Sequence, residues 1–422
     1  MQRVPYDVEL EPCRGRVGGC GLPTLQAAAH SSGTSQEMTR ASTDRARNGD
    51  GVTRTAARDR VFGLDLLRAA AITMVVVTHF SVVAGRIFDF PVPRHVRIGG
   101  TYGVELFFVL SGFLIGSLLL DIVEREPDFR SWRIFMIRRW MRTVPLYVLW
   151  VAILFVLWPP ADDWTGHALS YLTFTQNLAW PIGNWFGVSW TLSVEEWFYL
   201  LFSAVLLALA AIDGRKAVPI ACASFIVVPA VLRIAFGPAD GDLDATLRKV
   251  VIFRLDAIAY GVFVVWLCRH WPSVVRRWKA LAFAVGIILV ALTYAAGQAH
   301  WPITLSVAPL GLALLLPAAA ALGSAPAIVE VPIRWISERS YATYMVHLTI
   351  VAAVARAVTD GRLAAEFAIP LALIVTLALS DLSCRYFEKP ILRHRPFQFA
   401  PTREDSADGE ETIAQPSAAA SR

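Results

Sequence analysis

Charged residues are scarce in this chain. Asp, Glu, Lys and Arg make up 17% of its 422 residues, whereas a soluble globular domain has about 25%. Hydrophobic residues make up 55%, and several apolar runs reach the roughly 18 residues that are typical of a membrane-spanning helix. The composition therefore excludes a soluble enzyme and predicts an integral membrane protein.

Cysteine is also rare, with five residues in the chain and no CxxC spacing. This pattern indicates neither a zinc site nor a disulfide framework, and we predict that the protein holds no metal. The net charge of +5 does not indicate a nucleic-acid partner. Much of the excess lies in short loops between apolar runs, where Lys and Arg set the orientation in the bilayer.

Large apolar residues are few at both ends of the chain. Residues 1–58 are rich in Gly, Ser, Thr, Ala and Arg, and residues 396–422 are mainly polar. Neither segment buries enough apolar surface to offset the entropy of ordering, and no apolar stretch precedes a cleavage site, which excludes a signal peptide. We expect two disordered cytoplasmic tails around a membrane domain at 59–395.

The membrane domain is expected to be all-α, with about ten transmembrane helices. Apolar runs place the helices near 62–83, 99–120, 143–158, 193–212, 218–236, 248–267, 280–297, 304–322, 340–358 and 365–386. With the N-terminus inside, the inner loops carry 18 Lys and Arg residues and the outer loops carry 4. The positive-inside rule then predicts that both termini are cytoplasmic. We expect a multi-pass protein of the plasma (inner) membrane.

Two ionisable residues lie in the first apolar run, where such residues are by default functional candidates. Arg68 and His79 are eleven positions apart, so a helix brings them to one face, about 16 Å apart along its axis. Snorkelling to the nearest interface accounts for Arg68. It accounts less well for His79, because apolar residues surround it, and this favours a functional role.

A basic pair precedes the third run. Arg139 and Arg142 are spaced i,i+3 and share one helical face. An anchor at the inner membrane surface is one interpretation. Paired guanidinium groups also suit phosphate, so a cytoplasmic ligand that carries phosphates is the other interpretation.

Further polar residues occur inside or beside the runs. Glu195 and Glu196 are adjacent at the start of the fourth run, and because neighbouring helical residues point about 100° apart, at least one must face a polar interior. Each such residue alone is compatible with a structural buried group. Together they predict a cavity that accepts a polar substrate. The others are Glu105, Ser111, Arg254, Asp256, Tyr341 and His347.

Seven motifs follow one another along the membrane domain. They are Arg68 and His79 with ten residues between them, FFVLSGFLIG, RRWMRTVPLY, SWTLSVEEWFYL, FRLDAIAYG, SYATYMVH and YFEKPI. In these motifs the chain resembles the membrane O-acyltransferases of acyltransferase family 3 over about residues 62 to 392. Only about 30 residues follow, so the chain resembles the stand-alone members that carry no SGNH domain.

The resemblance implies a ten-helix domain that moves an acyl group, with acetyl the expected one, from cytoplasmic acyl-CoA to a hydroxyl. The acceptor would be a cell-surface glycan, a glycolipid or a secreted glycosylated metabolite of a bacterium. His79 would be the catalytic residue, with a general base preferred over an acyl-histidine intermediate. Glu195 or Glu196 would orient the imidazole or bind acceptor hydroxyls.

The remaining candidates would bind or guide substrates. Arg68, Arg139 and Arg142 would hold acyl-CoA, and the other polar residues named above would line the channel. A polytopic transporter or flippase for a polar or lipid-linked substrate is the alternative, because polar groups at mid-membrane and spans interrupted by proline fit it too. The sequence leaves the acyl chain, the acceptor and the oligomeric state open.

Overall fold

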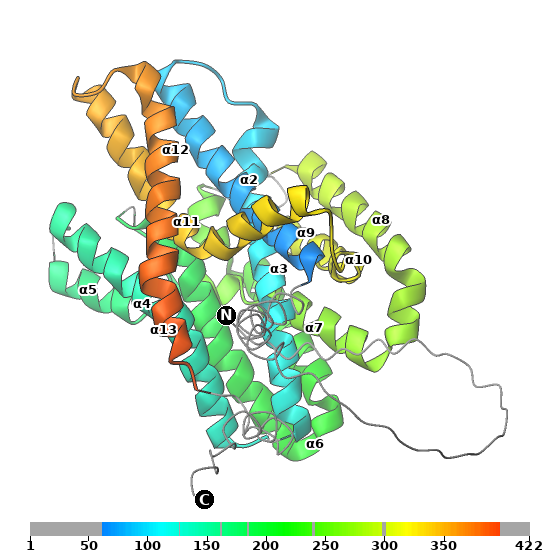
Figure 1. Cartoon of the computed structure of the whole chain (residues 1–422). Coiled ribbons are helices and arrows are strands. Elements are labelled where there is room, and N and C mark those ends of the chain that lie inside the picture. Colours follow the sequence, from blue (N-terminus) through cyan, green and yellow to red (C-terminus); the bar gives the residue numbers. More distant parts are fainter. Residues whose placement is uncertain are drawn as a thin grey trace, which may run out of the picture. The chain divides into compact units, whose positions relative to one another are not determined.

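The structure is a computed structural model. It describes residues 61–396 apart from 126, 161–162, 184, 239–240 and 298–300. Within these residues the elements are helices and there is no strand, which confirms the expected all-α class (Figure 1). The two tails predicted to be disordered lie outside this part of the chain, except for Pro396.

The helices run in the order α2 (Phe62–Ile87), α3 (Arg94–Arg125), α4 (Phe129–Leu157), α5 (Trp164–Leu172), α6 (Trp190–Phe236), α7 (Asp256–His270), α8 (Pro272–Ala296), α9 (Trp301–Ala313), α10 (Leu316–Ala320), α11 (Ala327–Thr359), α12 (Ala365–Leu382) and α13 (Lys389–Arg393). Short turns lie between some of them: η1 (Gly187–Ser189), η2 (Asp244–Arg248), η3 (Val251–Phe253) and η5 (Ser383–Glu388). Eight stretches of the described residues are long and apolar enough to cross a bilayer. The chain is therefore a multi-pass membrane protein, while the number of crossings and the side of the termini stay predictions.

Several helices differ from the expected runs. The run expected at 248–267 becomes an α-helix only at Asp256, the run at 304–322 is divided between α9 and α10, and α11 begins at Ala327 rather than near 340. α6 covers both 193–212 and 218–236, but Asp213 has non-helical φ and ψ of −150° and 96°, so two expected helices meet at a kink. α4 begins at Phe129 rather than near 143, because the Asp128 side chain caps it by accepting a hydrogen bond from the Ser131 amide. The arginines expected ahead of the third span therefore lie within a helix.

α3 lies at the centre of the helical packing. Its most apolar window is 78% buried, against 11% for that of α8, and α3 packs on α2 and α7 (Figure 1). A Cβ atom at Gly112 of α3 or at Gly261 of α7 would overlap backbone atoms of the other helix. Glycine at both positions thus allows the two backbones to touch, as is common between membrane helices.

α11 lies against α2 on one side and α12 on the other. An apolar cluster of Phe80, Val351 and Ala372 joins the three helices. This packing matters for the site, because Phe80 follows His79 directly and Val351 is one turn beyond His347. The cluster fixes the relative positions of the two histidines.

The segment expected as an outer loop, 159–192, folds back along α4. The Tyr147 hydroxyl donates to the Tyr171 carbonyl at 2.9 Å, and Tyr147 lies ten residues before the end of α4, or about 15 Å along its axis. Trp197, in the second turn of α6, donates to the Phe174 carbonyl at 2.9 Å. Part of the segment therefore lies at the depth of the helices rather than beyond their ends.

Non-helical backbone at this depth needs internal partners, because lipid offers none. The buried Asn177 supplies several of them. Its side-chain Nδ2 donates to the main-chain carbonyls of Trp190 at 3.2 Å and Lys249 at 2.6 Å, and its own main-chain carbonyl accepts from the Val251 amide at 2.9 Å. The two irregular segments, before α6 and before α7, thus satisfy each other.

Candidate active site

A pair of histidines from α2 and α11 forms the centre of the site. Nδ1 of His79 lies 3.1 Å from Nε2 of His347, and the ring centroids are 5.0 Å apart with 52° between the planes. His347 is fully buried and His79 is half-buried. The Val75 carbonyl is the second neighbour of Nδ1 of His79, at 2.9 Å. The structure therefore brings together two predicted site residues that are far apart in the chain.

A hydroxyl-bearing wall continues from this pair toward α6. The ring of Tyr344 lies 5.7 Å from that of His347, and its hydroxyl lies 3.0 Å from Oγ1 of Thr191. The Tyr344 hydroxyl also reaches the Val188 carbonyl at 3.2 Å. The surroundings of the histidine pair are thus both aromatic and polar.

Three charged residues near η2 form a group that motif analysis did not find. Asp244 pairs with Nε of Arg248 and with Nζ of Lys249, each at 2.5 Å, and the Arg248 guanidinium lies 4.7 Å from the Trp190 ring centroid. Burial raises the pKa of Asp244, but Arg248 and Lys249 outweigh it and hold that pKa at about 2. The charges of this group act on the His79 imidazole. The sequence did offer one signal for this group. Arg248 and Lys249 are adjacent and follow the expected outer loop 237–246, which contains no Lys or Arg.

Glu195 ends a chain of hydroxyl groups. The Tyr199 hydroxyl donates to Oε2 of Glu195 at 2.9 Å, so Ser111, 2.6 Å from the same hydroxyl, is the donor to Tyr199. The charges of Arg139 and Arg142 act on the Glu195 carboxylate. Ser111, Glu195 and the basic pair therefore share one neighbourhood.

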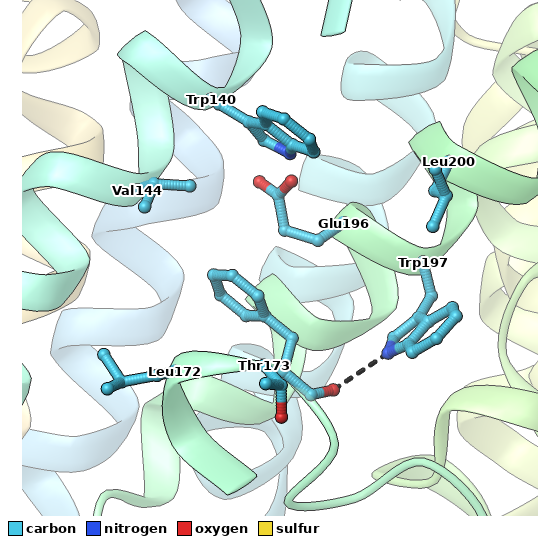
Figure 2. Close-up of a pocket in the computed structure, with 8 residues that line it drawn as sticks. Trp140, Val144, Leu172, Thr173, Glu196, Trp197 and Leu200 are labelled. Carbon is cyan, nitrogen blue, oxygen red and sulfur yellow. Dashed lines mark hydrogen bonds between the residues drawn. The ribbon is translucent and has the colours of Figure 1, made fainter. Parts of the chain in front are cut away.

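Glu196 points into a pocket between α4, α5 and α6. Its Oε1 accepts a hydrogen bond from Oγ1 of Thr143 at 2.6 Å, and the Thr143 carbonyl accepts from the Tyr341 hydroxyl at 2.5 Å. Oε2 of Glu196 is buried and makes no hydrogen bond of good geometry within the described part of the chain, and the Trp140 side chain interacts with the carboxylate. Figure 2 shows the carboxylate facing the Trp140 indole.

The pocket has a volume of about 350 Å³ and mainly apolar walls. Its lining residues are Trp140, Val144, Leu172, Thr173, Phe174, Glu196, Trp197 and Leu200 (Figure 2). Glu196 is the one charged group among them. A ligand that fits is therefore mostly apolar and carries a hydrogen-bond donor.

Four arginines gather beside this pocket. Arg395, beyond the end of α13, is the member that sequence analysis missed. Burial and the neighbouring charges of Arg138, Arg142 and Arg139 lower the pKa of Arg395. The Glu388 carboxylate lies within reach of the Arg142 charge. The group is positively charged overall and brings α4 and the end of the described chain together.

Three other predicted channel residues belong to two buried ion pairs. Nη2 of Arg254 lies 2.5 Å from Oε2 of Glu105, and Nη2 of Arg233 lies 2.6 Å from Oδ2 of Asp256. The Ser306 hydroxyl joins the second pair. These pairs tie α3, α6, α7 and α9 together, so the structure gives their members structural partners; their predicted place in a channel stays a prediction.

Arg68 lies apart from the histidine pair. It contacts the Ser337 hydroxyl at 3.5 Å and Asp65 at 3.7 Å, and Ser337 also donates to Asp65 at 2.6 Å. Arg68 and His79 therefore both face α11, as their spacing predicts. The side chain that hydrogen-bonds to His79 among the described residues is His347, and no hydrogen bond joins His79 to Glu195 or Glu196.

No group of three or more His, Cys, Asp and Glu side chains in the described ranges is arranged to hold a metal ion.

No solved structure matches the chain significantly. Several curated proteins do match, and three of them serve as examples. YrhL of Bacillus subtilis is 26% identical over 78% of this chain and 54% of its own length. The peptidoglycan O-acetyltransferase OatA of Listeria monocytogenes is 27% identical over 80% and 57%. The O-acetyltransferase OatA of Staphylococcus aureus is 25% identical over 81% and 59%.

The chain thus spans little more than half the length of the curated relatives it matches. A model of the acyltransferase domain matches residues 61–385. This match covers both histidines, both glutamates and the basic pair of α4. The chain therefore belongs to acyltransferase family 3.

Proposed function

We propose that this protein is a membrane O-acyltransferase of the plasma membrane that uses acyl-CoA as donor. The acyl group is expected to be acetyl, and the acceptor is a hydroxyl of a glycan or glycosylated molecule at the cell surface. The observation that carries the proposal is the contact of His79 with His347 inside the family's domain. It supplies a base where α2 and α11 bring two imidazole rings together, with Nδ1 of His79 3.1 Å from Nε2 of His347.

The arginine group supports a donor with phosphates. Four neighbouring guanidinium groups repel one another, and arginine does not give up its proton in proteins. A phosphate anion relieves this repulsion and accepts charge-assisted hydrogen bonds. Arg139 and Arg142 then hold the phosphates of CoA, with Arg138 and Arg395 beside them.

The pocket at Glu196 is where the pantetheine arm of CoA would lie. Trp140 and Val144 line it from α4, next in sequence to the basic pair, so a ligand bound at the arginines extends into it. The apolar walls suit the methylene and methyl groups of the arm, and the Glu196 carboxylate, which can accept further hydrogen bonds, suits one of its N–H or O–H donors. Glu195 connects this region to Tyr344, on which its charge acts, and hence to the histidine pair.

The chemistry needs a base near the acceptor hydroxyl. The hydroxyl proton passes to His79 while the alcohol oxygen bonds to the thioester carbonyl carbon. The carbon–sulfur bond then breaks, the ester is released, and the proton returns from His79 to the sulfur of CoA. Atoms and charge balance without a metal or redox cofactor.

The test uses membranes that contain the protein, labelled acetyl-CoA and an extract of surface glycans. We expect an alkali-labile label on glycan with the wild type and none with His79→Ala at equal abundance. Mass spectrometry of surface glycans and secreted metabolites, with and without the protein, then identifies the acceptor. Full transfer by His79→Ala would reject the assignment, and solute movement without ester formation would favour the transporter alternative.

The donor site has a separate test. Changing Arg139 and Arg142 together to Gln should weaken acyl-CoA binding more than acceptor binding, because only the donor carries the phosphates. Equal loss of both would indicate a folding defect instead.

A further inference from the structure

We infer that His347 is a positioning residue that holds His79 in one tautomer, with the proton on Nδ1 and the lone pair on Nε2. The inference rests on the proposed function, since His79 is taken as the base. It assigns Nε2 of His79 as the nitrogen that accepts the proton. It also gives a role to His347, the last residue of the motif SYATYMVH. The assignment follows from the hydrogen-bond partners of both rings.

The tautomer of His347 is fixed first. Its Nδ1 lies 2.9 Å from the Tyr344 carbonyl and 3.1 Å from the Thr343 carbonyl. Both are acceptors, so Nδ1 must carry a proton. The ring is fully buried, and no carboxylate hydrogen-bonds to it within the described residues, so a second proton would place an unpaired charge in the interior. Nε2 of His347 is therefore an acceptor.

The tautomer of His79 follows. Its Nδ1 faces two acceptors, the Val75 carbonyl at 2.9 Å and Nε2 of His347 at 3.1 Å. A proton on Nδ1 serves both in a shared hydrogen bond. The reverse arrangement would turn a lone pair of His79 toward the Val75 carbonyl and a lone pair of His347 toward two more carbonyls. Neutral His79 therefore presents its lone pair on Nε2, away from His347.

The contact with the helix backbone does not distinguish His79. His167, His270 and His394 also place Nδ1 at 3.2, 3.1 and 3.0 Å from the carbonyl four residues earlier. This contact is thus a common property of helical histidines in this protein. What is particular to His79 is the second acceptor on a neighbouring helix, which also restrains the ring against rotation.

The assignment has a consequence for the transfer step. The acceptor hydroxyl gives its proton to Nε2 of His79, and the resulting imidazolium keeps its Nδ1–H bond to His347. The same Nε2 then returns the proton to the departing sulfur. Because the proton is taken up and returned at the same nitrogen, the charges of Asp244, Arg248 and Lys249 act on the same imidazole in both steps.

The experiment compares His347→Gln with His347→Leu. A glutamine oxygen can replace Nε2 as acceptor, whereas leucine offers none. We expect the leucine variant to lose about 10- to 100-fold in kcat, in the range known for groups that orient a functional imidazole. The glutamine variant should keep most of the activity. His270→Leu is the matched control, because it removes a helical histidine outside the site and should leave kcat unchanged.

Nitrogen NMR of ¹⁵N-histidine-labelled protein in nanodiscs reports the tautomer directly. The wild type and His347→Gln should show His79 protonated on Nδ1, and His347→Leu should show a mixture with Nε2–H. A wild-type His79 protonated on Nε2 would overturn the inference, as would an unchanged tautomer and kcat in His347→Leu. Because this readout needs no substrate, it separates failure of the positioning role from failure of the proposed transferase activity. It also decides the question if the leucine variant does not fold.

Discussion

Glu105→Gln and Arg254→Met test whether the ion pair between α3 and the turn before α7 is structural or belongs to the channel. The two charged atoms are 2.5 Å apart, and the side chains are 2% and 0% exposed. A second bond, from Nη1 of Arg254 to the Leu305 carbonyl at 3.1 Å, remains when Glu105 loses its charge. Removing one partner leaves a buried charge uncompensated, which typically costs about 3–5 kcal/mol. Each single change should therefore lower the melting temperature and the abundance of the protein clearly.

The double variant, Glu105→Gln with Arg254→Met, separates the two roles. It removes both charges, and such replacements are often neutral or stabilising. We expect it to be more stable than either single variant and to recover acyl transfer. Melting temperatures in detergent and labelled acetyl transfer are the measurements. Arg356→Gln is the control. Arg356 is 71% exposed and lies 3.9 Å from Asp360, and such an exposed ion pair contributes little to stability. A double variant that is stable but inactive would show that the pair serves the substrate.

Three further changes test the packing, the pocket and the charged group at η2. Gly112→Val should prevent stable folding, because a Cβ there meets the α7 backbone, whereas Gly214→Ala, with nothing within 4 Å, should leave the melting temperature unchanged; equal effects would refute the close approach. Leu200→Trp fills the pocket and should raise KM for acyl-CoA by about tenfold, while Leu201→Trp, which does not line it, should not; an unchanged KM in both would remove the pocket from the donor path. Asp244 has a folded pKa of about 2, below its unfolded value of about 3.9, so its ion pairs stabilise fully above the unfolded value and are lost as the pH falls toward 2. The melting temperatures of wild type and Asp244→Asn should therefore differ by a constant amount above about pH 5 and converge in stronger acid, and a difference that grows on acidification would contradict this.

The sequence was sufficient to predict the helical class and the family. Hydropathy reports burial in lipid directly, so most of the apolar runs coincide with long helices, whereas the run at 248–267 holds a turn and the shorter helix α7. The spacing of Arg68 and His79 predicts a shared face because it depends only on helix geometry. Both side chains indeed face α11.

Partner choice was not predictable, because it depends on packing between distant segments. His79 and His347 are 268 residues apart in sequence, and only the packing of α2 on α11 brings them together. Glu195 or Glu196 was expected to orient the imidazole or to bind acceptor hydroxyls; Glu196 lines a pocket, and its role stays a prediction. Arg395 joins the α4 arginines through the same kind of distant contact. The segment 159–192 was expected as a loop beyond the helix ends, and part of it lies at their depth. Hydropathy does not detect this, because it says little about irregular backbone that is buried in protein.

The pairing of Asn177 with the turn before α7 sets an order for biogenesis. Its amide donates to the Lys249 carbonyl, 72 residues further along the chain, so this partner leaves the ribosome well after Asn177 does. The irregular stretch ahead of α6 cannot settle among the helices while α4 inserts, since the Asn177 side-chain amide and the main-chain carbonyls of Asn177 and Leu178 would meet hydrocarbon. It must wait in the aqueous phase until the later turn has been delivered. Nascent chains arrested shortly before Lys249 should therefore still be cut by protease in that stretch, whereas the finished protein resists.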